Sequence, residues 1–223
     1  MSTKKPTHSD DAIPVQSWLG KPVAYIPEGS LATLRGQAKS CRACPLWRRA
    51  TQTMFGLGSA RAKAVLVGEQ PGAQEDVAGQ PFVGPAGELL RRTMEAAGMD
   101  AKEIFLTNAV KHLKYERRGK NRLHKRANAD EQAACRPWLA AELLRIKPAL
   151  VLALGATAAQ TLFGPTFKLT RQRGRWTSIT PSVQGMATWH PSAILRMPSP
   201  GRAQALKQFQ CDISEFSEAL RKL

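Results

Sequence analysis

No long apolar run occurs in these 223 residues, and none approaches the ~20 residues that a membrane-spanning helix needs. The first residues, MSTKKPTHSDD, are polar and lack the apolar core of a secretory signal. Internal repeats are also absent. The lack of a membrane-spanning run and of a signal core argues against a membrane or exported protein, and we expect a cytoplasmic monomer with no membrane partner.

Acidic residues are scarce. The sequence has 17 Asp and Glu against 33 Lys and Arg, which gives a formal net charge of +16. One interpretation is a charge that keeps the protein soluble, and the other is a polyanionic partner, usually a nucleic acid. The basic residues are clustered, at 91–92, 111–126 and 168–175. This clustering favours a nucleic-acid partner.

Cysteines are few, and disulfides are not expected in a cytosolic chain. The four cysteines are Cys41, Cys44, Cys135 and Cys211. The Cys-x-x-Cys spacing of the first two indicates metal or redox chemistry. With Cys135 as a third ligand, a closed site needs a fourth, and the cysteine count alone proposes Cys211.

Short apolar runs alternate with helical patterns along the chain. Four runs are typical of buried strands, at 64–67, 104–106, 149–154 and 185–189. Strands that alternate with helices predict an α/β fold of three layers, α/β/α, around a central four-stranded parallel sheet. We expect a flexible polar tail over 1–25 and a single domain over 26–223.

Two local predictions concern less regular parts of the chain. The segment 113–128 is strongly basic and has no stable period, which predicts an exposed loop. Ser30 and Asp130 are expected to cap the helices that follow them.

Polar residues follow three of the predicted strands directly: Glu69 and Gln70, Asn108, and His190. Each alone has a structural explanation, as a turn, a loop cap or a hydrogen-bonded core histidine. The carboxyl ends of parallel strands meet at one edge of a sheet, so we expect these side chains to converge on one pocket. With Phe82 on the intervening loop, they suit a flat heterocycle with polar edges.

Three motifs together resemble the uracil-DNA glycosylase superfamily, in its iron–sulfur branch: GEQPGAQEDVAGQPFVGPAG at 68–87, TNAVKH at 107–112 and HPSAILR at 190–196. The resemblance implies the fold of that superfamily and excision of uracil from DNA. It implies that Phe82 stacks on the flipped uracil and that Asn108 hydrogen-bonds its edge. His190 would stabilise the negative charge of the leaving base, in a pocket lined by Gly68 and Gln70.

Within that branch the sequence is most similar to UdgX, the form that becomes covalently attached to uracil-containing DNA. GEQPG stands where ordinary family 4 enzymes usually have GEAPG, and the basic loop GKNRLHK at 119–125 resembles the Lys-Arg-Arg-Ile-His loop of UdgX. Asn121 replaces an arginine of that loop, and Leu123 replaces an isoleucine. The UdgX histidine attacks the anomeric carbon after base loss, and the resemblance assigns this role to His124.

Other residues are expected to support His124. Arg122 lies two positions earlier and points the same way in an extended backbone, so it would favour the neutral imidazole and contribute to substrate binding. Glu69 would orient the ring or accept its proton. Without the resemblance, the loop is interpreted as a solvated stretch that contacts phosphates. The candidate DNA-binding residues are Lys120, Lys125 and Ser192.

The resemblance also proposes a ligand set for a [4Fe–4S] cluster. His112 stands where family 4 enzymes have the cysteine of a Lys-Cys-Arg-Pro stretch, and Cys135 stands at the cysteine of Ala-Cys-Arg-Pro. The implied ligands are Cys41, Cys44, His112 and Cys135, which leaves Cys211 as a buried free thiol. Zinc stays open as the alternative, because three cysteines and a histidine suit it equally well.

The sequence therefore leaves three functional hypotheses. The first is a uracil-DNA glycosylase that is captured on its product through His124. The second is an ordinary family 4 glycosylase that turns over, and the third is a non-catalytic iron–sulfur module that binds nucleic acid. The expected partner is uracil-containing DNA, in single-stranded form.

Overall fold

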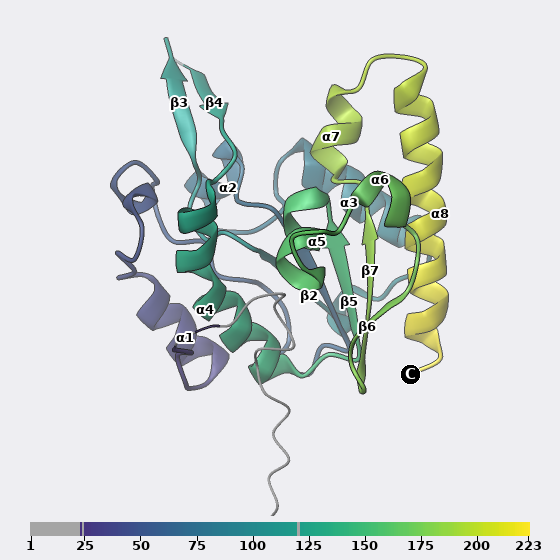
Figure 1. Cartoon of the computed structure of the whole chain (residues 1–223), viewed down its shortest axis with the longest axis horizontal. Helices are drawn as coiled ribbons and strands as arrows, with labels where there is room; N and C mark the ends of the chain where they lie inside the picture. The colour runs from purple at the N-terminus through teal and green to yellow at the C-terminus, as the bar shows by residue number, and fades with distance from the viewer. Residues whose placement is uncertain (1–22, 24, 120) are drawn as a thin grey trace, which may run out of the picture.

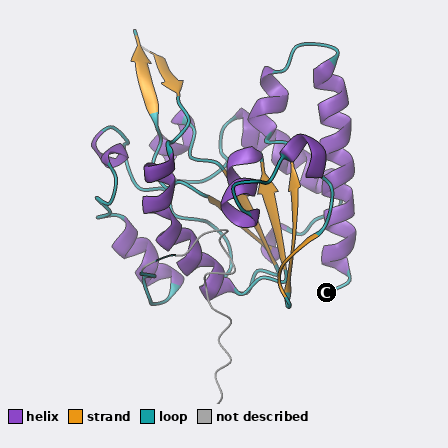
Figure 2. Ribbon diagram, viewed as in Figure 1, coloured by secondary structure: helices purple, strands orange, loops and turns teal. Residues whose placement is uncertain are grey.

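The computed structural model describes residues 23, 25–119 and 121–223, so most of the predicted tail lies outside the described residues. Helices cover both faces of one central sheet, and a separate two-stranded hairpin projects beyond it (Figures 1 and 2). The strands are β1 (Ala64–Gly68), β2 (Ile104–Asn108), β3 (Tyr115–Arg118), β4 (Asn121–His124), β5 (Leu150–Leu154), β6 (Thr177–Thr180) and β7 (Val183–Thr188). The helices are α1 (Leu31–Ala38), η2 (Pro45–Arg48), α2 (Ala73–Ala78), α3 (Pro85–Ala96), η3 (Ala101–Glu103), α4 (Ala129–Ile146), α5 (Ala156–Phe163), α6 (Leu169–Gln172), α7 (Pro191–Arg196) and α8 (Gly201–Arg221).

The central sheet has the strand order β2-β1-β5-β7-β6. Its first four strands are parallel and are the four predicted from the sequence. The predicted three-layer α/β fold is thus confirmed, but the sheet has a fifth strand, because β6 pairs antiparallel with β7 at one edge. The short run TSIT of β6 lies within a turn-rich basic stretch, so it had no pattern of its own to reveal it.

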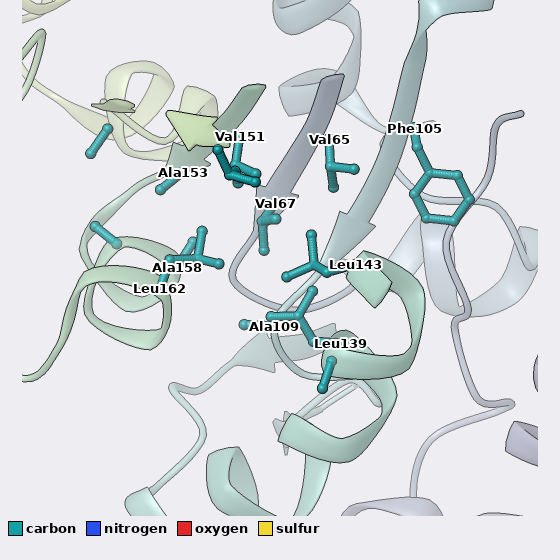
Figure 3. Close-up of a cluster of buried hydrophobic side chains, with 14 of the residues drawn as sticks. Val65, Val67, Phe105, Ala109, Leu139, Leu143, Val151, Ala153, Ala158 and Leu162 are labelled. Atoms are coloured by element: carbon teal, nitrogen blue, oxygen red, sulfur yellow. The ribbon is translucent and has the colours of Figure 1, made fainter. Parts of the chain in front are cut away.

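The two faces of the sheet pack against different helices, as the alternation of side chains along a strand requires. Val65, Val67 and Val151 face one layer, which includes Leu143 of α4 and Leu162 of α5 (Figure 3). The intervening strand residues face the other layer, which includes Leu90 of α3 and Phe209 of α8. Every residue of β1 and β5 is buried, which explains why these strands appear in the sequence as continuous apolar runs.

Side chains cap the helices close to the predicted positions. The Ser30 hydroxyl accepts a hydrogen bond from the Thr33 amide at 3.1 Å, which confirms the predicted cap of α1. The prediction for α4 was wrong: Asn128, not Asp130, is the cap, and it forms a capping box with Glu131. This helix therefore begins two residues earlier than the cap prediction implied, close behind the hairpin.

Most described residues of 113–128 are exposed, as predicted, but the prediction of a loop was wrong. Strands β3 and β4 pair antiparallel, with Tyr115 opposite His124 and Arg118 opposite Asn121. Gly119 adopts φ 60° in the connecting turn, as tight hairpin turns require. Lys120 lies outside the described residues. The hairpin carries mostly charged residues, so it has no apolar alternation to reveal its strands in the sequence.

The topology places the site at the carboxyl edge of the sheet. Strand β1 has β2 on one side and β5 on the other, so the chain moves to one side of β1 after that strand and crosses to the other side after β2. Such a switch point is where open α/β sheets bind ligands. In the described part of the chain, no helix is long and apolar enough to cross a membrane.

Candidate active site

A cavity of about 380 Å³ lies at this edge of the sheet. It is lined by residues that follow β1, β2 and β7, by the end of the hairpin and by α7. The sequence-predicted residues that the structure brings together here are Gln70, Phe82, Asn108, His124 and His190. These five residues contribute one aromatic ring, two amides and two imidazoles to the lining.

Gly68 is the point at which Asn108 and Phe82 meet. Gly68 pairs with Asn108 in the register of β1 and β2. A Cβ on Gly68 would lie 2.8 Å from Phe82 Cζ and closer still to Asn108 Oδ1. A glycine here therefore lets both side chains approach the strand end. No described residue hydrogen-bonds the side-chain amide of Asn108, which leaves that amide available to a ligand.

Phe82 has a strained backbone, with φ 59° in the left-handed region that non-glycine residues rarely adopt. Two features of the surrounding chain keep the Phe82 backbone in this conformation. Arg91 donates a hydrogen bond to the Phe82 carbonyl at 2.6 Å, and a Cβ on Gly87 would overlap the same carbonyl. Strain of this kind persists where the surrounding structure fixes a side chain for function. Here it fixes an aromatic ring, 5% exposed, at the pocket wall.

His190 begins α7 and presents a neutral imidazole to the pocket. Its Nδ1 accepts hydrogen bonds from the Ser192 amide at 3.1 Å and from the Ser192 hydroxyl at 2.7 Å. Because the amide can only donate, Nδ1 carries no proton and the ring proton lies on Nε2. Burial, followed by the charges of Arg196 and His124, lowers the His190 pKa from 6.5 to about 4. The ring is therefore a neutral donor at pH 7.

His124 ends β4 and meets Gln70 from the β1 loop. The Gln70 amide nitrogen donates to the carbonyls of Lys114 and Lys125, at 3.2 and 3.1 Å, and lies 2.9 Å from His124 Nε2. The two carbonyls identify this atom as nitrogen. A protonated His124 Nε2 would face another N–H, so Nε2 carries a lone pair and shares one of the two amide hydrogens. Partial desolvation lowers the pKa of His124, although the residue stays exposed, and the charge of Arg196 lowers it further.

The structure changes the expected roles of Arg122 and Glu69. Arg122 was expected to favour the neutral form of His124, but Arg196 is the guanidinium that does so. Glu69 acts on His124 through charge, which raises the pKa and opposes burial. Among the described residues, the side chain that hydrogen-bonds His124 is Gln70, not Glu69.

The remaining predicted residues are held by partners within the protein. The Arg122 guanidinium donates to Asp76 at 2.8 Å and packs over the Tyr115 ring at 5.0 Å, so it anchors the hairpin rather than lining the cavity. The Lys125 ammonium pairs with Glu116 at 2.9 Å. Ser192 lines the cavity while its amide and hydroxyl hold His190, as described above.

Sequence reasoning missed three residues of this region. Arg196 lines the cavity and lowers the pKa of both histidines, and its only signal was its place at the end of the HPSAILR motif. Glu75 accepts a hydrogen bond from the Gly84 amide at 2.9 Å and so closes the loop that carries Phe82. Asp76 is buried and receives Arg122, and no pattern in the sequence signalled either acid.

A model of the uracil DNA glycosylase superfamily matches residues 55–214, which include the whole pocket. The chain belongs to the uracil-DNA glycosylase superfamily. It is 35% identical to the type-4 uracil-DNA glycosylase of Thermotoga maritima, over 77% of this chain and 86% of that protein. It is 33% identical to the type-4 enzyme of Pyrobaculum aerophilum, over 83% and 92% of the two chains. It is 30% identical to the type-4 enzyme of Archaeoglobus fulgidus, over 86% of this chain and 94% of that protein.

Beside this glycosylase pocket lies a second group of residues, around Cys44 and Cys135. The two thiols are in hydrogen-bonding contact, which lowers the pKa of Cys44 to about 4 and raises that of Cys135 well above 9.0. His112 is next to Cys44 and lowers its pKa further. The His112 Nε2 lies 2.8 Å from the Thr53 hydroxyl, whereas its Nδ1 is buried without a partner among the described residues.

Cys41, three residues before Cys44, accepts a hydrogen bond from the Trp138 indole at 3.3 Å. In the described part of the chain, no three His, Cys, Asp or Glu side chains meet around one point as ligands of a single metal ion. The prediction that Cys211 is a buried thiol was wrong, because Cys211 is exposed on α8. The family model begins after Cys41 and Cys44, so its match does not extend to the first part of this group.

Proposed function

We propose that this member of the superfamily excises uracil from DNA and is then captured on the abasic sugar through His124. One observation carries the proposal. A neutral imidazole with a lone pair on Nε2 lies in the same cavity as the aromatic ring, the amide and the neutral histidine that suit a uracil. Glycosylases that only hydrolyse the bond need a water at this position.

In the first step, the bond between the sugar C1′ and the uracil N1 breaks, and the electron pair leaves with the base. Phe82 stacks on the flipped uracil, and the Asn108 amide reads its polar edge. The proton on His190 Nε2 is donated in a hydrogen bond to the developing anion, which a preorganised donor stabilises without reorganising. A His190 pKa of about 4 keeps this donor neutral, so it does not compete as an acid.

In the second step, the cationic sugar accepts the lone pair of His124 Nε2, and a C1′–N bond forms. The ring is then an imidazolium, which loses its Nδ1 proton to Glu69 or to water, and the uracil anion takes a proton from solvent. Gln70 must withdraw its hydrogen bond before attack, and its contacts with the carbonyls of Lys114 and Lys125 keep it in place afterwards. Proximity favours the imidazole over one competing water.

We also propose that Cys41, Cys44, His112 and Cys135 hold a [4Fe–4S] cluster. The chemistry of the donors supports it, since the thiols of Cys44 and Cys135 are in contact, His112 is next to Cys44, and Cys41 precedes Cys44 by three residues. The buried and unpartnered Nδ1 of His112 is the kind of atom that a metal ligand explains. Amide and indole donors to Cys135 and Cys41 are also usual around cluster thiolates. A cluster there would fix these segments structurally.

A denaturing gel tests the proposal. The protein is incubated with labelled single-stranded DNA that contains one uracil, and the wild type should produce a band shifted by the mass of the protein. His124→Ser should remove this band and release DNA with an abasic site, because the base pocket is intact and water enters. His190→Gln is the matched control, and it should slow uracil release itself, with less adduct as a consequence. If His124→Ser still forms the adduct, the nucleophile is a different residue.

The second candidate is an ordinary glycosylase that turns over, and the names of the type-4 relatives favour it. The same gel distinguishes the two. Wild-type protein that releases abasic DNA without a shifted band would show turnover and refute capture. Wild-type protein that gives neither product would refute excision.

A further inference from the structure

Another hollow, of about 440 Å³, lies between the hairpin and the end of η2. Its lining consists of Arg48 and Arg49 from the end of η2, and of Tyr115 and Arg117 from β3. The Tyr115 hydroxyl donates a hydrogen bond to the Arg49 carbonyl at 3.2 Å, which joins the two segments. The Arg48 guanidinium also packs over the Trp47 ring at 5.8 Å. The hollow is therefore a built surface between two elements.

The three guanidiniums of this hollow differ from the neighbouring lysines in their ion pairing. Among the described residues, no carboxylate oxygen lies within 4.0 Å of Arg48, Arg49 or Arg117. By contrast, the nearby ammonium groups of Lys114 and Lys125 each form an ion pair with a glutamate. Like charges placed together repel, and a bound anion relieves that repulsion. The hollow thus holds three guanidiniums that are available to a bound anion.

The hollow lies on the same face of the hairpin as His124. Residues opposite one another in an antiparallel pair share a face, and Tyr115 is opposite His124. Arg117 lies two residues further along β3, which is ~6.6 Å along the strand. That distance is of the order of one nucleotide of extended backbone. A strand whose flipped nucleotide reaches His124 can therefore place its neighbouring phosphates over the guanidiniums.

We propose that Arg48, Arg49 and Arg117 bind the phosphates of single-stranded DNA next to the nucleotide in the pocket. The proposal rests on the proposed function for the position of that nucleotide. A single strand fits because its extended backbone can follow a projecting hairpin, whereas a rigid duplex cannot bend around it without cost. Arginine suits the role, since its planar fork matches a phosphate.

The test compares two triple variants with the same loss of charge. The first is Arg48→Gln, Arg49→Gln and Arg117→Gln. The control replaces three exposed cations of α4 and of α8 with its C-cap, outside the hairpin and η2: Arg145→Gln, Lys207→Gln and Lys222→Gln. Both variants lower the formal net charge by 3, from +16 to +13. Circular dichroism checks that both fold.

The first measurement is the affinity for single-stranded DNA without uracil, at several salt concentrations. Each phosphate contact contributes ~0.7 to the slope of log K against log salt, so the hollow variant should lose about 2 from the slope. The control should retain the wild-type slope. Equal slopes for both variants would refute the phosphate site. This measurement needs no excision, so it tests the site even if the proposed glycosylase function fails.

The second measurement places the site relative to the pocket. Uracil release is compared between an oligonucleotide with the uracil between single flanking nucleotides and two longer ones, extended on either side. For the wild type, extension on one side should lower KM. The hollow variant should lose that gain and match the wild type on the short substrate. If the triple variant of the hollow keeps the lower KM on the longer substrate, the site is refuted. If a duplex lowers KM more than a single strand does, the single-strand preference is refuted.

Discussion

The buried pair of Lys111 and Glu142 gives the sharpest stability prediction. Lys111 Nζ lies 2.7 Å from Glu142 Oε2, and the two side chains are 1% and 0% exposed. The ammonium also donates to the Thr107 hydroxyl at 2.7 Å and to the Asn108 carbonyl at 2.8 Å. Glu142 Oε1 accepts from the Gly56 amide at 2.8 Å. All three donors of the ammonium are thus used.

Glu142→Gln should leave the Lys111 charge buried beside a neutral amide. Breaking one side of a buried pair costs about 3–5 kcal/mol. For a chain of this size that corresponds to a fall in Tm of roughly 6–20 °C. Urea unfolding followed by circular dichroism measures the free energy of unfolding directly. The double variant Lys111→Met with Glu142→Leu should lose less free energy of unfolding than Lys111→Met and Glu142→Leu lose in sum when made singly. The reason is that the double variant leaves no charge unpaired.

A surface pair provides the control. Glu88 and Arg92 lie one helical turn apart on α3 and are 53% and 75% exposed. Glu88→Gln should cost no more than ~0.5 kcal/mol, since exposed pairs of this kind contribute little. If Glu142→Gln also costs under about 1 kcal/mol, the buried network does not stabilise the fold as we infer.

Three further predictions concern the pocket and the thiols. Gly68→Ala should lower kcat/KM for uracil release by about 10²-fold, because the added Cβ displaces Asn108 and Phe82, and a wild-type rate would contradict this. His190 has a folded pKa of about 4 against 6.5, so it should destabilise the fold by up to about 3 kcal/mol as pH falls from 6.5 to 4. The free energy of unfolding of His190→Gln should depend less on pH between 6.5 and 4. A pH dependence equal to that of the wild type would show that His190 is not the cause. His112→Ala should lose visible absorbance near ~400 nm, whereas exposed Cys211→Ser should keep it, and the reverse would overturn the ligand set.

Much of the architecture was predictable because it depends on local pattern. The four parallel strands are continuous apolar runs, and burial on both faces requires that pattern. Their polar ends, at Asn108 and His190, had to meet once the strands were parallel. The hairpin and the fifth strand had no such pattern, because they lie at edges where charged and β-branched side chains contact solvent.

The sequence by itself determined the fold class, the strand ends and the chemical set of the pocket, because each depends on residue type and local spacing. Only the tertiary structure decided which partners those residues take. Gln70, not Glu69, contacts His124, since the hairpin carbonyls hold its amide. Arg122 turns to Asp76, because a buried carboxylate binds a guanidinium more strongly than solvent does. Partners of this kind come from distant parts of the chain, and no local pattern encodes them.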